Sequence, residues 1–334
     1  MTKALITGVT GMVGSHLLDY LVSNTDWDIS GMVRWRSPLD NIVQHVPRIN
    51  KGDRVRLVYG DLTDQASLYK IAHDVKPDYV FHLAAQSYPK VSFDSAEATL
   101  DTNILGTERV LNSLRLHAPD AIIHVCASSE VFGRVPREKL PINEECSFHP
   151  ASPYAISKVG TDLVGRYYAE AFGMNIMTTR MFTHTGPRRG DVFAESTFAK
   201  QIAMIERGML PPVIKVGNLD SLRTWADVRD AVRAYHMLVT IKPTPGAYYN
   251  IGGTTTRTVG EMLGTLVGLS TSKGLTTEID HDRIRPIDAD LQVPDTTKFR
   301  EHTGWQPQIP FEKTMQDLLD YWRERTAQSQ FLTR

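Results

Sequence analysis

The chain has 334 residues, a formal net charge of −1 and 22% charged residues, so no basic surface is indicated and nucleic acid is not an expected partner. Its two cysteines, Cys126 and Cys146, show neither metal-ligand spacing nor a disulfide framework, so no metal site is expected. No apolar run reaches the length of a membrane span, and the N-terminus resembles a strand rather than a signal peptide. We therefore expect a cytoplasmic protein without a membrane partner, large enough for two domains or one elaborated domain.

The first part of the chain alternates short apolar strands with helical stretches. Lys3–Thr7 is the first expected strand, and a glycine-rich segment then opens a helix that ends near Ser23. Further strands are expected at residues 27–33, 56–59, 79–83 and 121–126. Strands that alternate with helices predict an α/β fold, a Rossmann-type doubly wound parallel sheet.

Beyond about residue 183 this alternation stops. Pro211-Pro212, Gly217, Gly252-Gly253 and a final helix near residues 310–325 indicate a smaller, mixed α/β C-terminal domain. We expect residues 1–182, with about 217–252, to form the nucleotide-binding Rossmann domain. Residues from about 183 to 216 and from 253 to 334 would form the second, substrate-binding domain.

Gly8, Gly11 and Gly14 follow the first strand in the spacing G-x-x-G-x-x-G. The first glycine permits a tight turn, the second lets a pyrophosphate approach the backbone, and the third allows close contact between helix and sheet. A glycine-rich loop can also lack a ligand. Its place directly after an N-terminal strand favours a dinucleotide.

The end of the second strand distinguishes NAD from NADP. An NAD site carries a carboxylate there for the ribose 2′-hydroxyl, but this chain reads Val33-Arg34-Trp35-Arg36-Ser37. Arg34 and Arg36 can hold a 2′-phosphate through charge-assisted hydrogen bonds, although two solvated surface arginines would look the same. The sequence therefore predicts NADP.

Tyr154 and Lys158 are four residues apart, so on a helix their side chains lie on one face. An ammonium beside a phenol favours the phenolate and lowers the pKa of the phenol, which provides a base for a sugar hydroxyl at neutral pH. Taken alone, such a pair is more often an exposed helix face. The glycine-rich start and the Ser128-Ser129-Glu130 segment after an apolar strand favour the catalytic interpretation.

Several motifs spread over nearly the whole chain carry a resemblance to a known family. They are residues 7–14, Tyr59-Gly60-Asp61-Leu62-Thr63-Asp64, Leu83-Ala84-Ala85-Gln86-Ser87, Ser128-Ser129-Glu130, Tyr154 with Lys158, Pro187-Arg188-Arg189-Gly190 and Gly217-Asn218-Leu219-Asp220-Ser221-Leu222-Arg223. The chain resembles the extended short-chain dehydrogenase/reductases, and among these most closely the GDP-mannose 4,6-dehydratases.

The resemblance implies two sets of binding residues. The cofactor set comprises Gly8, Thr10, Gly11, Met12, Val13, Gly14, Arg34, Arg36, Ser37, Asp61, Leu62, Leu83, Ala84, Ala85, Gln86, Tyr154 and Lys158. Asp61 and Leu62 would flank the adenine, and Lys158 would also reach the nicotinamide ribose. The substrate set comprises Ser87, Ser129, Thr183, Arg188, Lys215, Arg223 and Arg285, with Arg223 and Arg285 near the phosphates of the sugar nucleotide.

The chain also departs from the family pattern. It has Thr183 where the family usually has Asn, Thr185-Gly186 where the family has Glu-Ser, and Thr224 in place of an Asp. These departures leave the chemistry intact and leave the identity of the sugar open.

The resemblance implies a lyase of deoxysugar biosynthesis, with Ser128, Glu130, Tyr154 and Lys158 as catalytic residues. Eliminating water between C5 and C6 of a hexose needs an acid/base group beyond Ser, Tyr and Lys, and Glu130 would be that group. Glu130 could also be a surface carboxylate at a strand end. A reductase of GDP-4-keto-6-deoxy sugars, a nucleotide-sugar epimerase and a non-catalytic NADP-binding regulator are the alternatives.

The partners expected are a nucleotide sugar, with a GDP-hexose favoured, and further copies of the chain. A long connection runs from Arg34 to the third strand near Arg56, longer than is usual between such elements. In the resembling dehydratases this loop reaches a neighbouring subunit, which implies a homotetramer. A surface loop on a homodimer formed by helices near residues 100–117 and 155–172 is the alternative.

Overall fold

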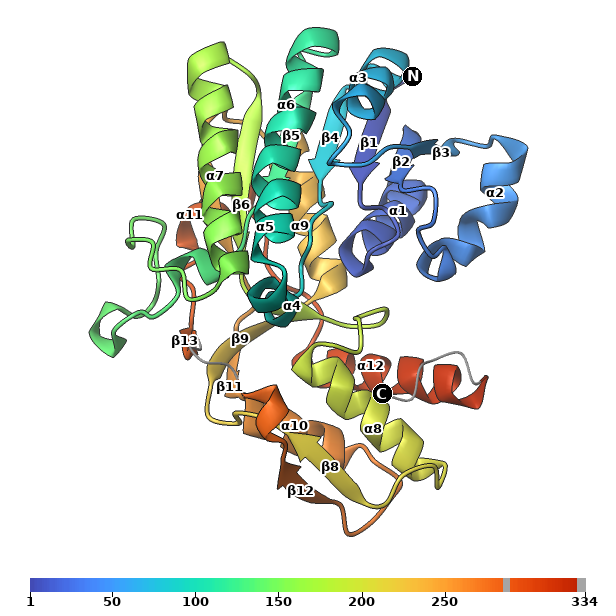
Figure 1. The fold of residues 1–334 in the computed structure, drawn as a ribbon, viewed down its shortest axis with the longest axis vertical. Helices are drawn as coiled ribbons and strands as arrows, with labels where there is room; N and C mark the ends of the chain where they lie inside the picture. The colour runs from blue at the N-terminus through green and yellow to red at the C-terminus, as the bar shows by residue number, and fades with distance from the viewer. Residues whose placement is uncertain (285–288, 329–334) are drawn as a thin grey trace.

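The computed structural model describes residues 1–284 and 289–328. A parallel sheet with helices on both faces forms the upper part of the molecule, and a smaller group of strands and helices from the C-terminal half lies below it (Figure 1). None of the described helices is both long and apolar enough to cross a membrane.

The large sheet has seven strands in the order β10-β6-β5-β4-β1-β2-β3, and every pairing is parallel. Its strands are β1 (Lys3–Thr7), β2 (Asp28–Val33), β3 (Val55–Tyr59), β4 (Tyr79–His82), β5 (Ile122–Cys126), β6 (Ile176–Met181) and β10 (Tyr248–Ile251). The doubly wound parallel fold predicted from the sequence is confirmed. The five strands expected in the first part of the chain have the predicted bounds to within one residue.

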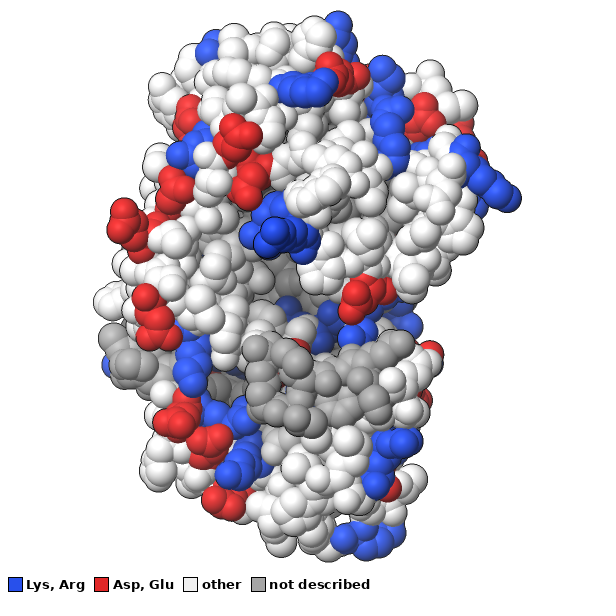
Figure 2. All heavy atoms as spheres, turned by 45° about the vertical axis from the view of Figure 1, so that its right-hand side comes forward, with Lys and Arg blue, Asp and Glu red and all other residues white. Residues whose placement is uncertain are grey.

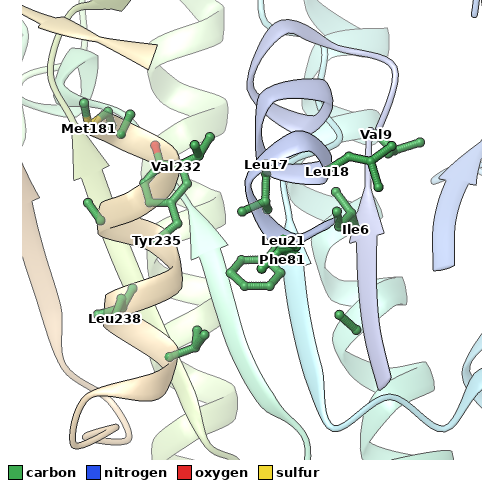
Figure 3. Close-up of a cluster of buried hydrophobic side chains, with 14 of the residues drawn as sticks. Ile6, Val9, Leu17, Leu18, Leu21, Phe81, Met181, Val232, Tyr235 and Leu238 are labelled. Atoms are coloured by element: carbon green, nitrogen blue, oxygen red, sulfur yellow. The ribbon is translucent and has the colours of Figure 1, made fainter. Parts of the chain in front are cut away.

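Helices cover both faces of this sheet. One face carries α1 (Met12–Asn24), α9 (Val228–Thr240) and α11 (Thr297–Thr303), and the other carries α3 (Gln65–Val75), α6 (Gly106–His117) and α7 (Pro153–Phe172). Successive strand residues point to opposite faces, so Ala4 and Ile6 pack under α1 whereas Leu5 packs under α3. Figure 3 shows the first of these cores, with side chains of α1 beside Ile6 of β1 and Phe81 of β4, and with α9 lying over β5 and β6. Burial on both faces explains why the strands are almost continuously apolar.

The helical segment before α6 contains a π-helical turn. α4 (Pro89–Asp94) and α5 (Ala96–Leu100) precede this turn, Asp101–Leu105, which continues into α6. Within the turn, the buried Asn103 amide donates to the carbonyl of Gln86 and to the hydroxyl of Ser157, and it accepts from the Gln86 N–H. The turn therefore ties the segment after β4 to α7.

The smaller part of the molecule is built around a second sheet and a short ribbon. β9 (Leu222–Asp227) pairs with β11 (Thr255–Thr258), β13 (Leu291–Gln292) and β7 (His184–Thr185), while β8 (Val213–Val216) pairs with β12 (Thr276–Ile279). The helices α8 (Ala194–Glu206), α10 (Val259–Gly268) and α12 (Phe311–Ala327) share one apolar core with β8. α12 confirms the final helix expected near residues 310–325.

The long connection between β2 and β3 packs against its own chain. A 3-10 turn, Asp40–His45, leads into α2 (Val46–Lys51), and Ile42 is fully buried. The His45 Nε2 lies 2.6 Å from the Asp19 Oδ1 on α1, and Asn41 donates to the carbonyl of Thr10. At the start of the connection, the Trp35 side chain is 78% exposed.

A buried ion pair fixes α7 to the sheet. The Arg180 Nε and Nη2 lie 2.7 and 3.2 Å from the two carboxylate oxygens of Asp162, and Nη1 donates to the Glu144 carbonyl. Both side chains are almost completely buried, at 1% and 0% exposure, so neither charge can be solvated if its partner is lost.

We expect Arg180→Ala to lower the free energy of unfolding by about 3–5 kcal/mol, because the buried Asp162 carboxylate loses both of its hydrogen bonds from the Arg180 guanidinium. Urea denaturation measures this loss. The matched control is Arg166→Ala, since Arg166 is 36% exposed and lies 3.7 Å from the same carboxylate. It should cost about 1 kcal/mol or less. Equal losses for the two variants would contradict the importance assigned to the buried pair.

Candidate functional site

A large cleft lies between the carboxyl edge of the parallel sheet and the C-terminal elements. Its volume is about 1890 Å³. A pocket for one ligand usually has roughly 300–1,000 Å³, so this cleft has room for a dinucleotide and a second large ligand. Figure 2 shows the hollow across the middle of the molecule, with Lys and Arg side chains along its edges.

Nearly all of the residues that the sequence predicted for the site line this cleft. They include the four catalytic candidates, the glycine loop, Arg34 and Ser37, the segment from Asp61 to Leu62, the segment from Leu83 to Ser87, and Ser129, Thr183, Arg188, Lys215 and Arg223. Arg36 is absent from the lining, and Arg285 lies outside the described residues. Among the residues that are described, no group of three or more His, Cys, Asp or Glu side chains could hold a metal.

The glycine loop joins the ends of β1 and β4. Gly8 has a φ of +74°, and a Cβ there would lie 2.9 Å from the backbone of Ala84. A Cβ on Gly14 would lie 2.2 Å from the Gly8 carbonyl oxygen, so α1 begins directly against the loop. No side chain caps the start of α1, which leaves the N–H groups of its first turn available to a phosphate. This close, uncapped backbone fits the pyrophosphate of a dinucleotide.

The turn after β2 faces the cleft with one arginine. Two hydrogen bonds between Arg34 and Ser37 close the turn. The Arg34 N–H donates to the Ser37 hydroxyl, and the Ser37 N–H donates to the Arg34 carbonyl. Both residues line the cleft, whereas the Trp35 ring turns outward onto Tyr59, with ring centroids 5.2 Å apart. An arginine and a hydroxyl at this place can bind an anionic group on the adenosine ribose.

Tyr154 lies in the first turn of α7, and Ser152 is the N-cap residue of this helix. The Ser152 hydroxyl accepts from the Ala155 N–H, and the Tyr154 N–H donates to the Ser92 hydroxyl. Burial raises the pKa of Tyr154 above its ordinary value, and a hydrogen bond with Ser128 acts in the opposite direction. The expectation that Lys158 gives this phenol a low pKa is therefore wrong for the chain without its ligands, because burial dominates.

Lys158 nevertheless lies next to the end of β5. It is buried with its Nζ 2.7 Å from the carbonyl oxygen of Cys126 at the end of β5, and burial lowers the pKa of its ammonium. The Cys126 carbonyl thus holds the ammonium at the end of β5, two residues before Ser128.

Glu130 is placed by the same strand end. It lies in a 3-10 turn, Ser129–Phe132, and its N–H donates to the Ser128 hydroxyl. Because the Ser128 oxygen accepts this bond, its own proton can point toward Tyr154. The Glu130 carboxylate lies 3.9 Å from the Arg223 guanidinium of β9, and the two side chains are 16% and 13% exposed. The carboxylate therefore faces the cleft rather than open solvent.

Sequence reasoning missed two residues that line the cleft, Arg189 and His184. Arg189 lies with its guanidinium 3.4 Å from the centre of the Phe193 ring and its Nε 3.0 Å from Glu195, and its charge lowers the pKa of Tyr154. Burial, together with Arg189, lowers the pKa of His184 to about 4, so this histidine is neutral at pH 7. The Pro187–Gly190 motif was the available signal, but the choice between its two arginines was not visible in the sequence.

Arg188, the arginine that the sequence favoured, has another contact. Its Nη1 lies 2.7 Å from the Asp19 Oδ2 on α1, and its φ is +67°. It lines the cleft but is paired toward α1, on the side of the nucleotide loop.

The departures from the family pattern fall mostly outside the cleft. Thr183 lines it, whereas Thr185, Gly186 and Thr224 do not. Thr224 is buried and lies 2.9 Å, hydroxyl to hydroxyl, from Thr256 of the neighbouring strand. These differences therefore concern the second sheet more than the reacting sugar.

The glycine loop and the Tyr154 phenol open onto the same cleft. A dinucleotide seated on the loop would thus bring its nicotinamide to a phenol that can exchange a proton with a second ligand. This is the arrangement of the extended short-chain dehydrogenase/reductases that act on sugar nucleotides.

Residues 5–318 match the family model described as GDP-mannose 4,6 dehydratase, and the chain belongs to this family. The GDP-mannose 4,6 dehydratase of Drosophila melanogaster is 32% identical over 95% of this chain and 85% of its own length. The resemblance inferred from the motifs is confirmed.

Solved structures show the same fold over nearly the whole chain. The structure of RMD from Pseudomonas aeruginosa complexed with NADPH has a TM-score of 0.82 and 27% identity, covering 97% of this chain and 100% of that one. The dTDP-glucose 4,6-dehydratase from Bacillus anthracis in complex with NAD has a TM-score of 0.83 at 20% identity, with 98% of each chain covered.

Proposed function

We propose that this protein is an NADP-dependent nucleotide-sugar 4,6-dehydratase that converts GDP-mannose, or a related GDP-sugar, to the GDP-4-keto-6-deoxy sugar. The observation that carries the proposal is the Glu130 carboxylate in the cleft, on a residue whose backbone N–H donates to the Ser128 hydroxyl, which in turn forms a hydrogen bond with the Tyr154 phenol. A reductase or epimerase needs only the serine, tyrosine and lysine. A second acid/base group beside them suits the elimination of water.

The residues divide the proton transfers between them. Tyr154 takes the proton of the C4 hydroxyl, while Ser128 hydrogen bonds the C4 oxygen and orients the ring. A nicotinamide cofactor held by the glycine loop, Arg34 and Lys158 would supply a hydride acceptor for C4 and, once reduced, a hydride donor for C6. The C4 ketone acidifies C5, where Glu130 removes the proton and then gives it to the departing C6 hydroxyl, which leaves as water. Tyr154 finally returns its proton to C5.

The choice of NADP rests on the turn after β2. Arg34 and Ser37 line the cleft where the second ribose would lie, and the Asp61 carboxylate, which also lines the cleft, follows β3 instead. The Pseudomonas aeruginosa neighbour is complexed with NADPH, whereas the Bacillus anthracis neighbour is complexed with NAD. A guanidinium and a hydroxyl suit a 2′-phosphate better than a 2′-hydroxyl.

Assembly into a homo-oligomer is proposed from an apolar surface on α6 and α7. These helices lie side by side on one face of the sheet (Figure 1). Their outward side chains include Leu116, Leu163 and Tyr167, which are 51%, 47% and 58% exposed. Such a surface suits a second copy of the chain, and the exposed Trp35 offers a further contact for a tetramer.

The two cysteines are both free, as is usual for a protein of the reducing cytoplasm.

Arg34→Ser should weaken NADP binding by about 10- to 100-fold, the equivalent of one charged hydrogen-bonded contact, and leave NAD binding unchanged. The matched control is Arg36→Ser, which should alter neither because Arg36 does not line the cleft. Fluorescence titration at constant ionic strength measures both affinities. Tighter binding of NAD than of NADP by the unmodified protein would overturn the cofactor proposal.

Glu130→Gln should reduce dehydration of GDP-mannose by about 10²–10⁴-fold, because the amide keeps the shape but cannot accept the C5 proton. Mass spectrometry follows the loss of water, and absorbance follows cofactor reduction, which should persist in the variant. The control is Glu138→Gln on an exposed turn. Dehydration at the unmodified rate would rule out Glu130, and stoichiometric NADPH consumption with a 4-keto sugar would instead indicate the reductase.

Leu163→Glu should shift the protein from dimers or larger assemblies to monomers, since it places a charge in the middle of the apolar surface. Light scattering gives the mass. The control is Met209→Glu, at a residue that is 43% exposed on the turn after α8. A monomeric unmodified protein at all concentrations would refute the contact.

A further inference from the structure

We propose that Asp19 of α1 is a positioning residue for the reaction. By pairing with Arg188 it fixes the turn formed by residues 186–190, and so keeps the neighbouring Arg189 close to Tyr154. The inference rests on the proposed function in one respect, which is that Tyr154 is the base of the reaction. No motif in the sequence assigned a role to Asp19.

The Asp19 carboxylate lies between two segments that are far apart in the sequence. Its Oδ1 accepts from the His45 Nε2 at 2.6 Å and from the Gln44 Nε2 at 2.9 Å, both on the connection between β2 and β3. Its Oδ2 forms an ion pair with the Arg188 Nη1 at 2.7 Å. Two hydrogen bonds from the connection thus set the direction of the carboxylate, and in this direction Oδ2 faces Arg188.

The Asp19 carboxylate is charged at neutral pH. Burial would raise the pKa of Asp19, but the contacts with His45 and Arg188 outweigh this effect and hold the pKa below its ordinary value. The Asp19 and Arg188 side chains are 32% and 19% exposed, so water and salt screen the ion pair only in part. The pair is therefore stronger than one on an open surface.

The backbone of Arg188 needs this support. Its φ is +67°, in the left-handed region that residues other than glycine rarely adopt. The carbonyl of Pro187, just before it, accepts from the Nε2 of His16, which precedes Asp19 by about one turn of α1. Burial lowers the pKa of His16 to about 4, so the ring is neutral at pH 7 and donates from Nε2. α1 therefore holds two successive residues of the turn, Pro187 by its backbone and Arg188 by its side chain.

The next side chain, that of Arg189, is directed toward α8 instead of α1. The Arg189 Nε donates to the Glu195 Oε1 at 3.0 Å, and the Arg189 carbonyl accepts from the Ser196 hydroxyl at 2.7 Å. The guanidinium lies over the Phe193 ring, which meets the ring of Tyr88 edge-on with centroids 5.8 Å apart. The turn is thus held between two helices, by α1 at Arg188 and by α8 at Arg189.

Arg189 acts on the Tyr154 phenol through its charge. Both residues line the cleft. Burial raises the pKa of Tyr154, and the positive charge of Arg189 acts in the opposite direction. A guanidinium that moved away would leave the phenol harder to ionise. Loosening the turn at Arg188 therefore weakens the base, although Asp19 itself touches neither Tyr154 nor the reacting sugar.

The experiment follows single-turnover reduction of NADP by a saturating sugar nucleotide on the full chain, by stopped-flow absorbance, as a function of pH. Asp19→Asn can still accept from His45 and Gln44 but cannot form an ion pair with Arg188. We expect the ascending limb of the pH profile to move up by about 0.5–1 pH unit, which makes reduction about three- to tenfold slower at neutral pH and is recovered at higher pH. Arg188→Ala should move the limb in the same direction. Asp26→Asn, at an exposed aspartate between α1 and β2, is the matched control and should leave the limb in place.

Two further measurements isolate the route through Arg189. On an Arg189→Ala background, Asp19→Asn should cause no further movement of the limb, because the charge that it positions is already gone. Hydrogen exchange of the full chain without ligands gives a readout that needs no activity. The Arg189 N–H donates to the Gly186 carbonyl at 3.3 Å across the turn, and Asp19→Asn should speed the exchange of this N–H.

The outcomes separate this inference from the proposed function. A limb that stays in place in Asp19→Asn and Arg188→Ala, or a rate that falls equally at every pH, would overturn the inference, as would a further shift on the Arg189→Ala background. Unchanged exchange at the Arg189 N–H would overturn it even in a protein that oxidises no sugar nucleotide. A limb that moves as expected, in a protein that oxidises a GDP-sugar without releasing water, would support the role of Asp19 and refute the dehydratase.

Discussion

The site depends on the close contact between the ends of β1 and β4. The chain places β2 and β3 on one side of β1 and β4, β5, β6 and β10 on the other, so the strand order reverses between β1 and β4. A crevice forms at such a reversal because the two connections leave in opposite directions. Here the Thr7 hydroxyl accepts from the N–H groups of Leu83 and Ala84, and a side chain on Gly8 would collide with Ala84. The dinucleotide has its place because these two strand ends are fixed together.

Buried polar groups extend this arrangement outward from the crevice. His82 lies between the Thr7 and Thr107 hydroxyls at 2.9 and 3.1 Å, which links β1 through β4 to α6. Asn103 then links the Gln86 segment to Ser157 of α7, one turn from Tyr154. A buried polar group without a partner costs about 1–3 kcal/mol, so each satisfied bond removes alternative placements of the elements it joins. The Tyr154 phenol is thereby held in a fixed position relative to the glycine loop.

The two parts of the molecule contribute different functions to one cleft. The parallel sheet supplies the nucleotide loop and the groups at the ends of β4 and β5, whereas β9 and the β8–β12 ribbon supply Arg223, Lys215 and Glu278. The two meet where Arg223 lies 3.9 Å from Glu130. Under the proposed function, a substrate would span both parts, with its reacting carbons near the ends of β4 and β5. Chemistry and specificity can change independently in such a design.

The sequence by itself determined the features that depend on local order. Alternating apolar strands and helices identified the parallel sheet, the spacing of Gly8, Gly11 and Gly14 identified the nucleotide loop, and the four-residue spacing of Tyr154 and Lys158 put them on one helix face. These patterns are readable because each is set within a few residues by backbone geometry.

Only the tertiary structure decided which side chains meet across long separations. Arg34 rather than Arg36 faces the cleft, and Arg189 rather than Arg188 influences Tyr154, although in each pair the two arginines are near neighbours in sequence. The phenol pKa also depends on the surroundings, because the buried side chain responds more to lost solvation than to the lysine that the sequence places beside it. Glu278 lies opposite Lys215 because of the register of β8 with β12, which no linear pattern in the sequence indicates. Side-chain direction and solvation are properties of the packed chain, so a linear pattern does not contain them.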